Sequence, residues 1–183
     1  MSRNWKKVNS KIVYSNPWIK VHEDEVVMPN GKESVYGYLE KPAGCFVIAL
    51  DDDENIYLVK QYRYTLKKAI LELPAGTVDG DDITDRAKAE LLEETGITAK
   101  KWRKLGGFYV APGHETTYIH VFLATDLDLS QMTTKGQEGD ESILEIVKVK
   151  LPKLKKMIID GKMECGISVA SLNLFFLNHE KGG

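Results

Sequence analysis

Three glutamates with helical spacing are the clearest chemical feature of this 183-residue sequence. Glu93 and Glu94 follow Glu90 by three and four residues, so on a helix all three share one face. Like charges in this arrangement repel by roughly 0.2–0.5 kcal/mol per pair. A cluster with that cost suggests a counter-ion, and carboxylate oxygens on a rigid helix suit Mg²⁺ or Mn²⁺. A solvated acidic helix face is the alternative, and the glutamates alone do not separate the two.

The flanking residues predict where this helix begins and ends. Asp81 and Asp82 are good starting residues, and Asp85 is an acidic partner three residues after Asp82. Gly96 is a natural C-terminal stop. Residues 71–76 are predicted to be the end of a strand that runs into a loop. Strand, glycine-containing loop and acidic helix in succession are the layout of a binding site.

The segment from Gly76 onward resembles a Nudix box. That pattern is glycine, five residues, glutamate, seven residues, Arg-Glu, an aliphatic residue, any residue, Glu-Glu, any residue, glycine and an aliphatic residue. The matching residues are Glu90, Leu91, Glu93, Glu94, Gly96 and Ile97. Ala89 stands where the pattern has arginine, Asp81 stands where it has its first glutamate, and the loop from Gly76 to Asp81 is one residue shorter.

The resemblance implies a role for the missing arginine. In the family it pairs with the glutamates of the metal site and orients them. Arg86 lies four residues before Glu90, on the same helix face. We therefore hypothesise that Arg86 supplies the cation that Ala89 does not.

Other segments resemble the ADP-ribose and nucleotide-sugar pyrophosphatase branch of that family. They are Asn16-Pro-Trp18, Gln61-Tyr-Arg63, Glu72-Leu-Pro-Ala-Gly76 and Tyr109-Val-Ala-Pro-Gly113. In this branch the leading strands usually cross to a second subunit, which implies a homodimer. The implied activity is Mg²⁺-dependent hydrolysis of a nucleoside diphosphate sugar, ADP-ribose first, to AMP and ribose 5-phosphate.

Three other functions stay open. One is a pyrophosphatase that prefers another nucleotide sugar, such as ADP-glucose or GDP-mannose. The second is a Nudix-fold nucleotide-binding regulator with weak catalysis. The third is a nucleoside triphosphate sanitiser, against which the N-terminal strand segment and Gln61-Tyr-Arg63 argue.

The pattern of apolar residues predicts an α/β fold with a mixed sheet between helices. The resemblance specifies a Nudix-type α/β/α sandwich over residues 41–183, preceded by an antiparallel strand segment over residues 1–40. Expected strands are 11–15, 18–28, 34–40, 44–50, 56–63, 106–110, 118–124 and 143–149. Expected helices are 82–95, a segment from Pro152 to about 160, and 167–179, with a polar loop over 126–142.

The resemblance and the chemistry of the side chains give a candidate site. Metal ligands are Glu90 and Glu94, with Glu93 as a second-ion ligand or base and the carbonyl of Ala75 as a further ligand. Substrate contacts are Arg63, Glu72, Trp18 and Pro112. Arg63 could instead be a surface cation, Glu72 a cross-strand ion pair and Trp18 a packed anchor.

The general base is expected in the loop that follows the Nudix box. Glu141 is the first choice, because it lies nearest to the next strand, and Glu138 is the second. A solvated acidic loop is the alternative there.

Composition sets outer limits on function. A net charge of −2 gives no general attraction to nucleic acid or to an anionic membrane. Cys45 and Cys165 have no zinc-site spacing, and no apolar run of eighteen residues exists. These features predict a cytoplasmic enzyme with neither nucleic acid nor membrane as a partner.

Overall fold

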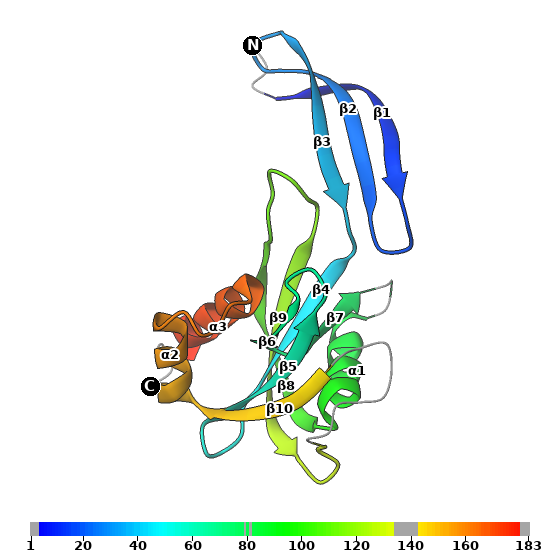
Figure 1. Ribbon diagram of the computed structural model, residues 1–183. Coiled ribbons are helices and arrows are strands. Elements are labelled where there is room, and N and C mark those ends of the chain that lie inside the picture. The colour runs from blue at the N-terminus through cyan, green and yellow to red at the C-terminus, as the bar shows by residue number, and fades with distance from the viewer. Residues whose placement is uncertain (1–3, 79, 81, 134–142, 180–183) are drawn as a thin grey trace. The chain divides into compact units, whose positions relative to one another are not determined.

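The computed structural model describes residues 4–78, 80, 82–133 and 143–179 (Figure 1). The chain forms two compact units. The first consists of Met1–Ala43 and Tyr109–Tyr118, and the second of Gly44–Phe108 and Ile119–Gly183. In the part of the chain that the structure describes, no helix is long and apolar enough to span a membrane.

The first unit contains a three-stranded antiparallel sheet. Its strands are β1 (Lys6–Ser15), β2 (Lys20–Val27) and β3 (Glu33–Glu40), in the order β1-β2-β3. Asn16 shapes the turn after β1, since its side-chain oxygen accepts hydrogen bonds from the N–H groups of Trp18 (2.9 Å) and Ile19 (2.8 Å). The antiparallel N-terminal strands are therefore as predicted, although β1 begins earlier than expected.

The second unit has two sheets. One has the order β7-β4-β9-β8, with β4 (Ala43–Ala49), β7 (Ala75–Val78), β8 (Thr98–Tyr109) and β9 (Tyr118–Asp128). The other has the order β10-β5-β6, with β5 (Asn55–Arg63), β6 (Lys68–Glu72) and β10 (Ile143–Lys150). β4 and β9 are parallel, whereas β5 is antiparallel to both of its neighbours.

Helices flank these strands. They are α1 (Ile83–Thr95), α2 (Leu151–Ile159) and α3 (Gly166–His179). Figure 1 shows α1 on one side of the strands of the second unit and α2 with α3 on the other. The predicted layered α/β arrangement is confirmed.

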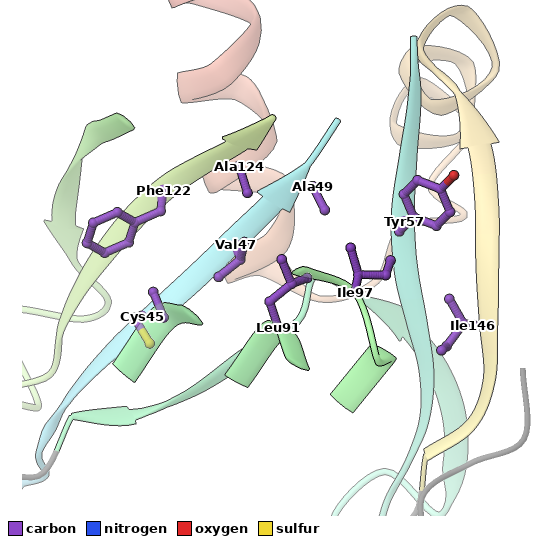
Figure 2. Close-up of a cluster of buried hydrophobic side chains, with 10 residues drawn as sticks. Cys45, Val47, Ala49, Tyr57, Leu91, Ile97, Phe122, Ala124 and Ile146 are labelled. Carbon is purple, nitrogen blue, oxygen red and sulfur yellow. The ribbon is translucent and has the colours of Figure 1, made fainter. Parts of the chain in front are cut away.

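A buried apolar cluster joins α1 to both sheets. Leu91 of α1 and Ile97 after it are fully buried and lie between β4 and β5 (Figure 2). Val47 of β4 and Tyr57 of β5 are also fully buried in this cluster. Burial of a side chain such as Leu91 contributes about 1.5–3 kcal/mol, so the cluster fixes the helix on the sheets.

The expectation of a loop from Gly76 to Asp81 was wrong in its first part, because Ala75–Val78 forms β7. The strand lies at the edge of the sheet beside β4, and the N–H of Val47 donates to the carbonyl of Pro74 at 2.9 Å. Pairing with a distant strand creates β7, and a short segment with glycine and alanine carries little strand signal of its own.

Two further strands differ from the expectation. β6 was not predicted beyond its last residues, and β8 is much longer than the predicted 106–110. β8 has one solvated face with many exposed lysine and arginine residues, and these obscure the pattern of apolar residues by which a strand is recognised in a sequence.

Candidate active site

Helix α1 is defined at both ends by side-chain and backbone chemistry. The Asp82 carboxylate accepts hydrogen bonds from the N–H groups of Thr84 (2.8 Å) and Asp85 (3.2 Å), as expected of an N-cap. The Asp85 carboxylate instead pairs with Lys88. Gly96 has a φ of 71°, and its N–H donates to the carbonyl of Leu92. A side chain at Gly96 would also overlap the backbone of Gln131, so this stop requires glycine.

Glu90 and Glu94 are buried and lie one turn apart on α1. They are only 2% and 4% exposed, whereas Glu93 is exposed. A buried carboxylate is costly unless it is paired or binds a metal. Two buried carboxylates on one helix face therefore require hydrogen-bond donors, a cationic side chain or a metal ion close to them.

The backbone of β7 supplies part of that compensation. The N–H of Ala75 donates to Glu94 Oε2 at 3.0 Å. Gly76 lies so close to Glu90 that a Cβ at residue 76 would overlap the carboxylate atoms of Glu90. The absence of a side chain at Gly76 thus lets Glu90 lie against the strand. Metal coordination by the carbonyl of Ala75 stays a prediction.

Arg86 provides a positive charge at the same place. Its Nη2 hydrogen-bonds to Glu90 Oε1 and lies 3.4 Å from Glu93 Oε2. Burial alone would lower the pKa of Arg86, but the hydrogen bond and charge of Glu90 outweigh it and raise the pKa. The expected contact between Arg86 and Glu90 is therefore present, and one guanidinium bridges two of the three glutamates.

Cys45 of β4 also lies beside this cluster, although no sequence motif indicates it. Its Sγ is 3.6 Å from the carbonyl oxygen of Gly76. Burial raises the pKa of Cys45 to about 11, and the charge of Glu90 adds to the effect. The thiol is therefore neutral and fills space, and it is not a nucleophile. No spacing rule connects residue 45 to residue 76, so only the pairing of β4 with β7 reveals it.

Arg63 and Glu72 form an ion pair between β5 and β6. Arg63 Nε and Nη2 each lie 2.7 Å from Glu72 Oε2, and Glu72 is 5% exposed. Glu72 therefore forms the cross-strand ion pair that was the alternative for this residue, and Arg63 is not an isolated surface cation. Arg63 remains partly exposed, so a contact between it and substrate stays a prediction.

The other predicted substrate contacts lie in the first unit. Trp18 is 74% exposed, so the alternative that it is a packed anchor is wrong within a single chain. It borders a hollow of about 250 Å³ that Lys20, Lys41 and Pro42 also line. Pro112 is exposed. Trp18 and Pro112 both stay predictions as substrate contacts.

Three residues of the sequence analysis cannot be placed. Asp81, Glu138 and Glu141 lie outside the described residues.

The donor set on α1 fits a hard divalent cation. Magnesium in proteins is commonly held by one or two carboxylates together with waters and substrate phosphates. Glu90 and Glu94 offer two carboxylates on one rigid face, with Glu93 beside them. Within the described ranges, no group of three or more His, Cys, Asp or Glu side chains is placed so that it could hold a metal ion. The arrangement matches a site that water and a phosphate-containing substrate would complete.

Comparisons with known proteins agree with this arrangement. Residues 5–39 match a model described as the nucleoside diphosphate sugar hydrolase N-terminal domain, and residues 40–162 match the NUDIX domain. A solved structure described as an ADP compounds hydrolase superposes with a TM-score of 0.83, over 98% of this chain and 96% of that one. At 22% identity this likeness supports the fold alone.

Curated relatives cover most of the chain. ADP-ribose pyrophosphatase of Bacillus subtilis is 34% identical over 154 residues, 84% of this chain and 82% of that protein. A methanol dehydrogenase activator of Bacillus methanolicus is 30% identical over 173 residues, 91% of this chain and 92% of that protein. GDP-mannose pyrophosphatase of Escherichia coli O1:K1 / APEC is 29% identical over 132 residues, 69% of each chain. With a family model that spans residues 40–162 and an acidic helix of the matching pattern, this chain belongs to the Nudix hydrolase family.

Proposed function

We propose that this protein hydrolyses the pyrophosphate bond of a nucleoside diphosphate sugar with the help of a divalent cation. ADP-ribose is the leading substrate, with AMP and ribose 5-phosphate as products. The observation that carries the proposal is the buried pair Glu90 and Glu94, held against the backbone of β7. The printed names of the relatives, ADP-ribose pyrophosphatase and GDP-mannose pyrophosphatase, support the substrate class.

We assign the cation as Mg²⁺, with Mn²⁺ as a substitute. Glu90 and Glu94 would hold it, with the carbonyl of Ala75 and the side chain of Glu93 as further ligands. The bound ion would neutralise pyrophosphate charge and favour attack by water. The residues of α1 contribute fixed positions for these oxygens, because the helix is capped at both ends and anchored in the core.

Arg63 is the proposed contact to the phosphates or to the terminal ribose. Its planar guanidinium suits phosphate oxygens, and Glu72 holds two of its N–H groups so that the fork is oriented in advance. Trp18 would stack on the base, and Pro112 would line the substrate. The roles of Trp18 and Pro112 rest on the family resemblance.

Glu141 is the proposed general base, and Glu138 is the second choice. Glu141→Gln should lower kcat by ~10²–10⁴ with KM largely kept, because the neutral amide cannot accept the proton from water. Glu145→Gln is a matched control, since Glu145 is an exposed glutamate of β10 that faces Lys60. Wild-type turnover of Glu141→Gln would contradict this assignment.

We also propose a homodimer that forms through the first unit. Every residue of β1 is exposed in the single chain, and large apolar side chains are among them. The exposed apolar residues of this unit include Trp5, Val8, Ile12, Tyr14 and Val35. A patch of this kind marks an interaction surface in many proteins. Sedimentation velocity should give the mass of two chains, and a monomer at micromolar concentration would refute the proposal.

A cytoplasmic location is part of the proposal. Cys45 and Cys165 are both free thiols, as expected in a reducing compartment.

A substrate panel tests the main activity and separates it from its rivals. ADP-ribose, ADP-glucose, GDP-mannose and nucleoside triphosphates would be assayed with and without Mg²⁺. We expect Mg²⁺-dependent release of AMP from ADP-ribose. Glu94→Gln should abolish the release, while Glu145→Gln should retain it. GDP-mannose as the best substrate would assign another nucleotide sugar, and cleavage of triphosphates alone would favour a sanitiser.

A regulatory protein is the second candidate function. Its support is the similarity over 91% of the chain to a protein named methanol dehydrogenase activator, together with Ala89 in place of the family arginine. Tight nucleotide binding without hydrolysis of any panel member would favour this candidate and refute the first.

A further inference from the structure

We propose that Arg86 is the positioning residue of the metal site. In the family pattern an arginine at position 89 orients the glutamates, and here Arg86, about one turn earlier on α1, does so in its place. The inference rests on the proposed function, since it concerns the same carboxylates. It goes beyond that function because it assigns a role to a residue outside the family pattern.

The first argument is the geometry of the helix. Residues separated by three or four positions are neighbours on a helix surface. Arg86 is therefore a neighbour of both Ala89 and Glu90, and position 89 is in turn a neighbour of Glu93. An arginine at position 89 would face Glu93, and Arg86 contacts both Glu90 and Glu93, so both positions direct a guanidinium at this group of carboxylates. The guanidinium of Arg86 extends along the helix as far as Glu93, whose Oε2 lies 3.4 Å from its Nη2.

The second argument is the observed contact. Arg86 Nη2 reaches the Oε1 atom of Glu90 and also lies 3.4 Å from Glu93 Oε2. Two acceptors on one rigid guanidinium restrict the rotamers of both glutamates. A lysine would provide a point charge and would not fix both orientations in the same way.

The third argument concerns charge and burial. Glu90 is 2% exposed and Glu94 is 4% exposed, so their charges are poorly hydrated. Arg86 is only about one-third exposed, and its charge is therefore weakly screened from Glu90. Lys88, two residues along the helix, is directed to Asp85 at 2.8 Å and compensates a different charge. Arg86 is thus the cation that α1 directs at its buried glutamate.

Substrate-free binding of Mn²⁺ tests this role without relying on activity. Arg86→Ala should weaken Mn²⁺ binding by about 10–100-fold, the usual loss when a residue that orients metal ligands is removed. The turnover of ADP-ribose should fall by a similar factor. Electron paramagnetic resonance of free Mn²⁺ measures the first quantity, and a phosphate-release assay measures the second.

A relocated arginine provides the decisive comparison. In the double variant Arg86→Ala/Ala89→Arg, the guanidinium occupies the family position, so we expect Mn²⁺ affinity to recover to within a few-fold of wild type. Lys88→Ala is the control, because it removes one positive charge from the same helix without touching Glu90. It should bind Mn²⁺ and melt like the wild type. Arg86→Ala leaves Glu90 buried without its cation and should melt lower, so its Mn²⁺ affinity is measured well below its Tm.

Two results would overturn the inference. One is unchanged or tighter Mn²⁺ binding in Arg86→Ala, which would mean that Arg86 does not orient the ligands or competes with the ion. The other is an Arg86→Ala/Ala89→Arg variant that melts normally and binds Mn²⁺ no better than Arg86→Ala. A wild-type protein that binds Mn²⁺ yet cleaves no panel member would refute the proposed function and leave this inference intact.

Discussion

The close approach of Gly76 to Glu90 predicts that a single methyl group can damage the site without damaging the fold. In Gly76→Ala, the new Cβ would overlap the Oε1, Cδ and Cγ atoms of Glu90. The overlapping atoms belong to a side chain with rotatable bonds, so we expect the carboxylate of Glu90 to rotate away from β7. The rotation would also break its contact with Arg86.

The cost to stability should be small. The backbone of Gly76 lies outside the left-handed region, so alanine is compatible with it and gains about 0.4–1 kcal/mol through the unfolded state. Once the carboxylate of Glu90 has rotated into solvent, loss of its pair with Arg86 costs about 0–1 kcal/mol, whereas a carboxylate that stayed buried without a partner would cost about 3–5 kcal/mol. These terms nearly cancel, which corresponds to a change in Tm of no more than about 4 °C.

The cost to function should be much larger. A displaced metal ligand should weaken Mn²⁺ binding by at least about 10–100-fold, or about 1.4–2.7 kcal/mol. Titration with Mn²⁺, steady-state hydrolysis of ADP-ribose and a thermal melt would be measured on the same preparation. Gly37→Ala is the matched control, because Gly37 is also a strand glycine and its added Cβ would meet only the carbonyl oxygen of His22, at 3.8 Å.

Two outcomes would refute this reasoning. Wild-type Mn²⁺ affinity in Gly76→Ala would show that the position of Glu90 does not depend on residue 76. A Tm far below that of Gly37→Ala would show that Glu90 cannot move without disturbing the core.

Two further predictions concern groups outside the metal site. Burial alone would raise the pKa of Asp51, but hydrogen bonds from Lys148 and Asn55 outweigh it and lower the pKa. Asp51 should therefore stabilise the fold above its unfolded pKa of about 3.9 and lose this effect as the pH falls through its lower folded pKa. Urea unfolding should show that Asp51→Asn is at least about 1.5 kcal/mol less stable than the wild type at pH 7. This difference in the free energy of unfolding should become smaller at low pH, and a difference that grows in acid would contradict the reasoning. Because burial raises the pKa of Cys45 to about 11, that thiol should react with an aromatic disulfide reagent at pH 8 only after unfolding. Cys165 is also a free thiol, so the labelling is measured in Cys165→Ser, and rapid labelling of this native variant would exclude the burial of Cys45.

The elements with strong local signals were predictable from sequence. Asp82 and Gly96 define α1 through hydrogen bonds and a backbone angle that few other residues provide, and the structure contains both. The contact between Arg86 and Glu90 followed from the periodicity of the same helix. Both predictions depend on residues only a few positions apart, which is where sequence patterns carry the most information.

Contacts between distant segments were not predictable in the same way. β7 exists because Ala75–Val78 lies beside β4, which is about thirty residues away, and its composition resembles a loop. The proximity of Cys45 to Gly76 follows from that pairing and from no local motif. The close approach of Gly76 to Glu90 likewise depends on how β7 crosses α1. The sequence placed Gly76 in a loop, whereas in the structure its missing side chain leaves space for the carboxylate of Glu90 beside β7.

The position of Arg86 bears on how departures from a motif should be interpreted. A motif records one residue at each position, but a helix offers several positions from which one side chain reaches the same partner. Ala89 is a departure from the Nudix-box pattern, whereas Arg86 places a guanidinium on the carboxylate of Glu90. The chemistry requires a cation at the carboxylates and does not require it at a given sequence number. Loss of the pattern arginine is therefore weak grounds for assigning this chain to the catalytically reduced members of its family, and the Mn²⁺ affinity of the relocated-arginine variant measures how far the two positions are equivalent.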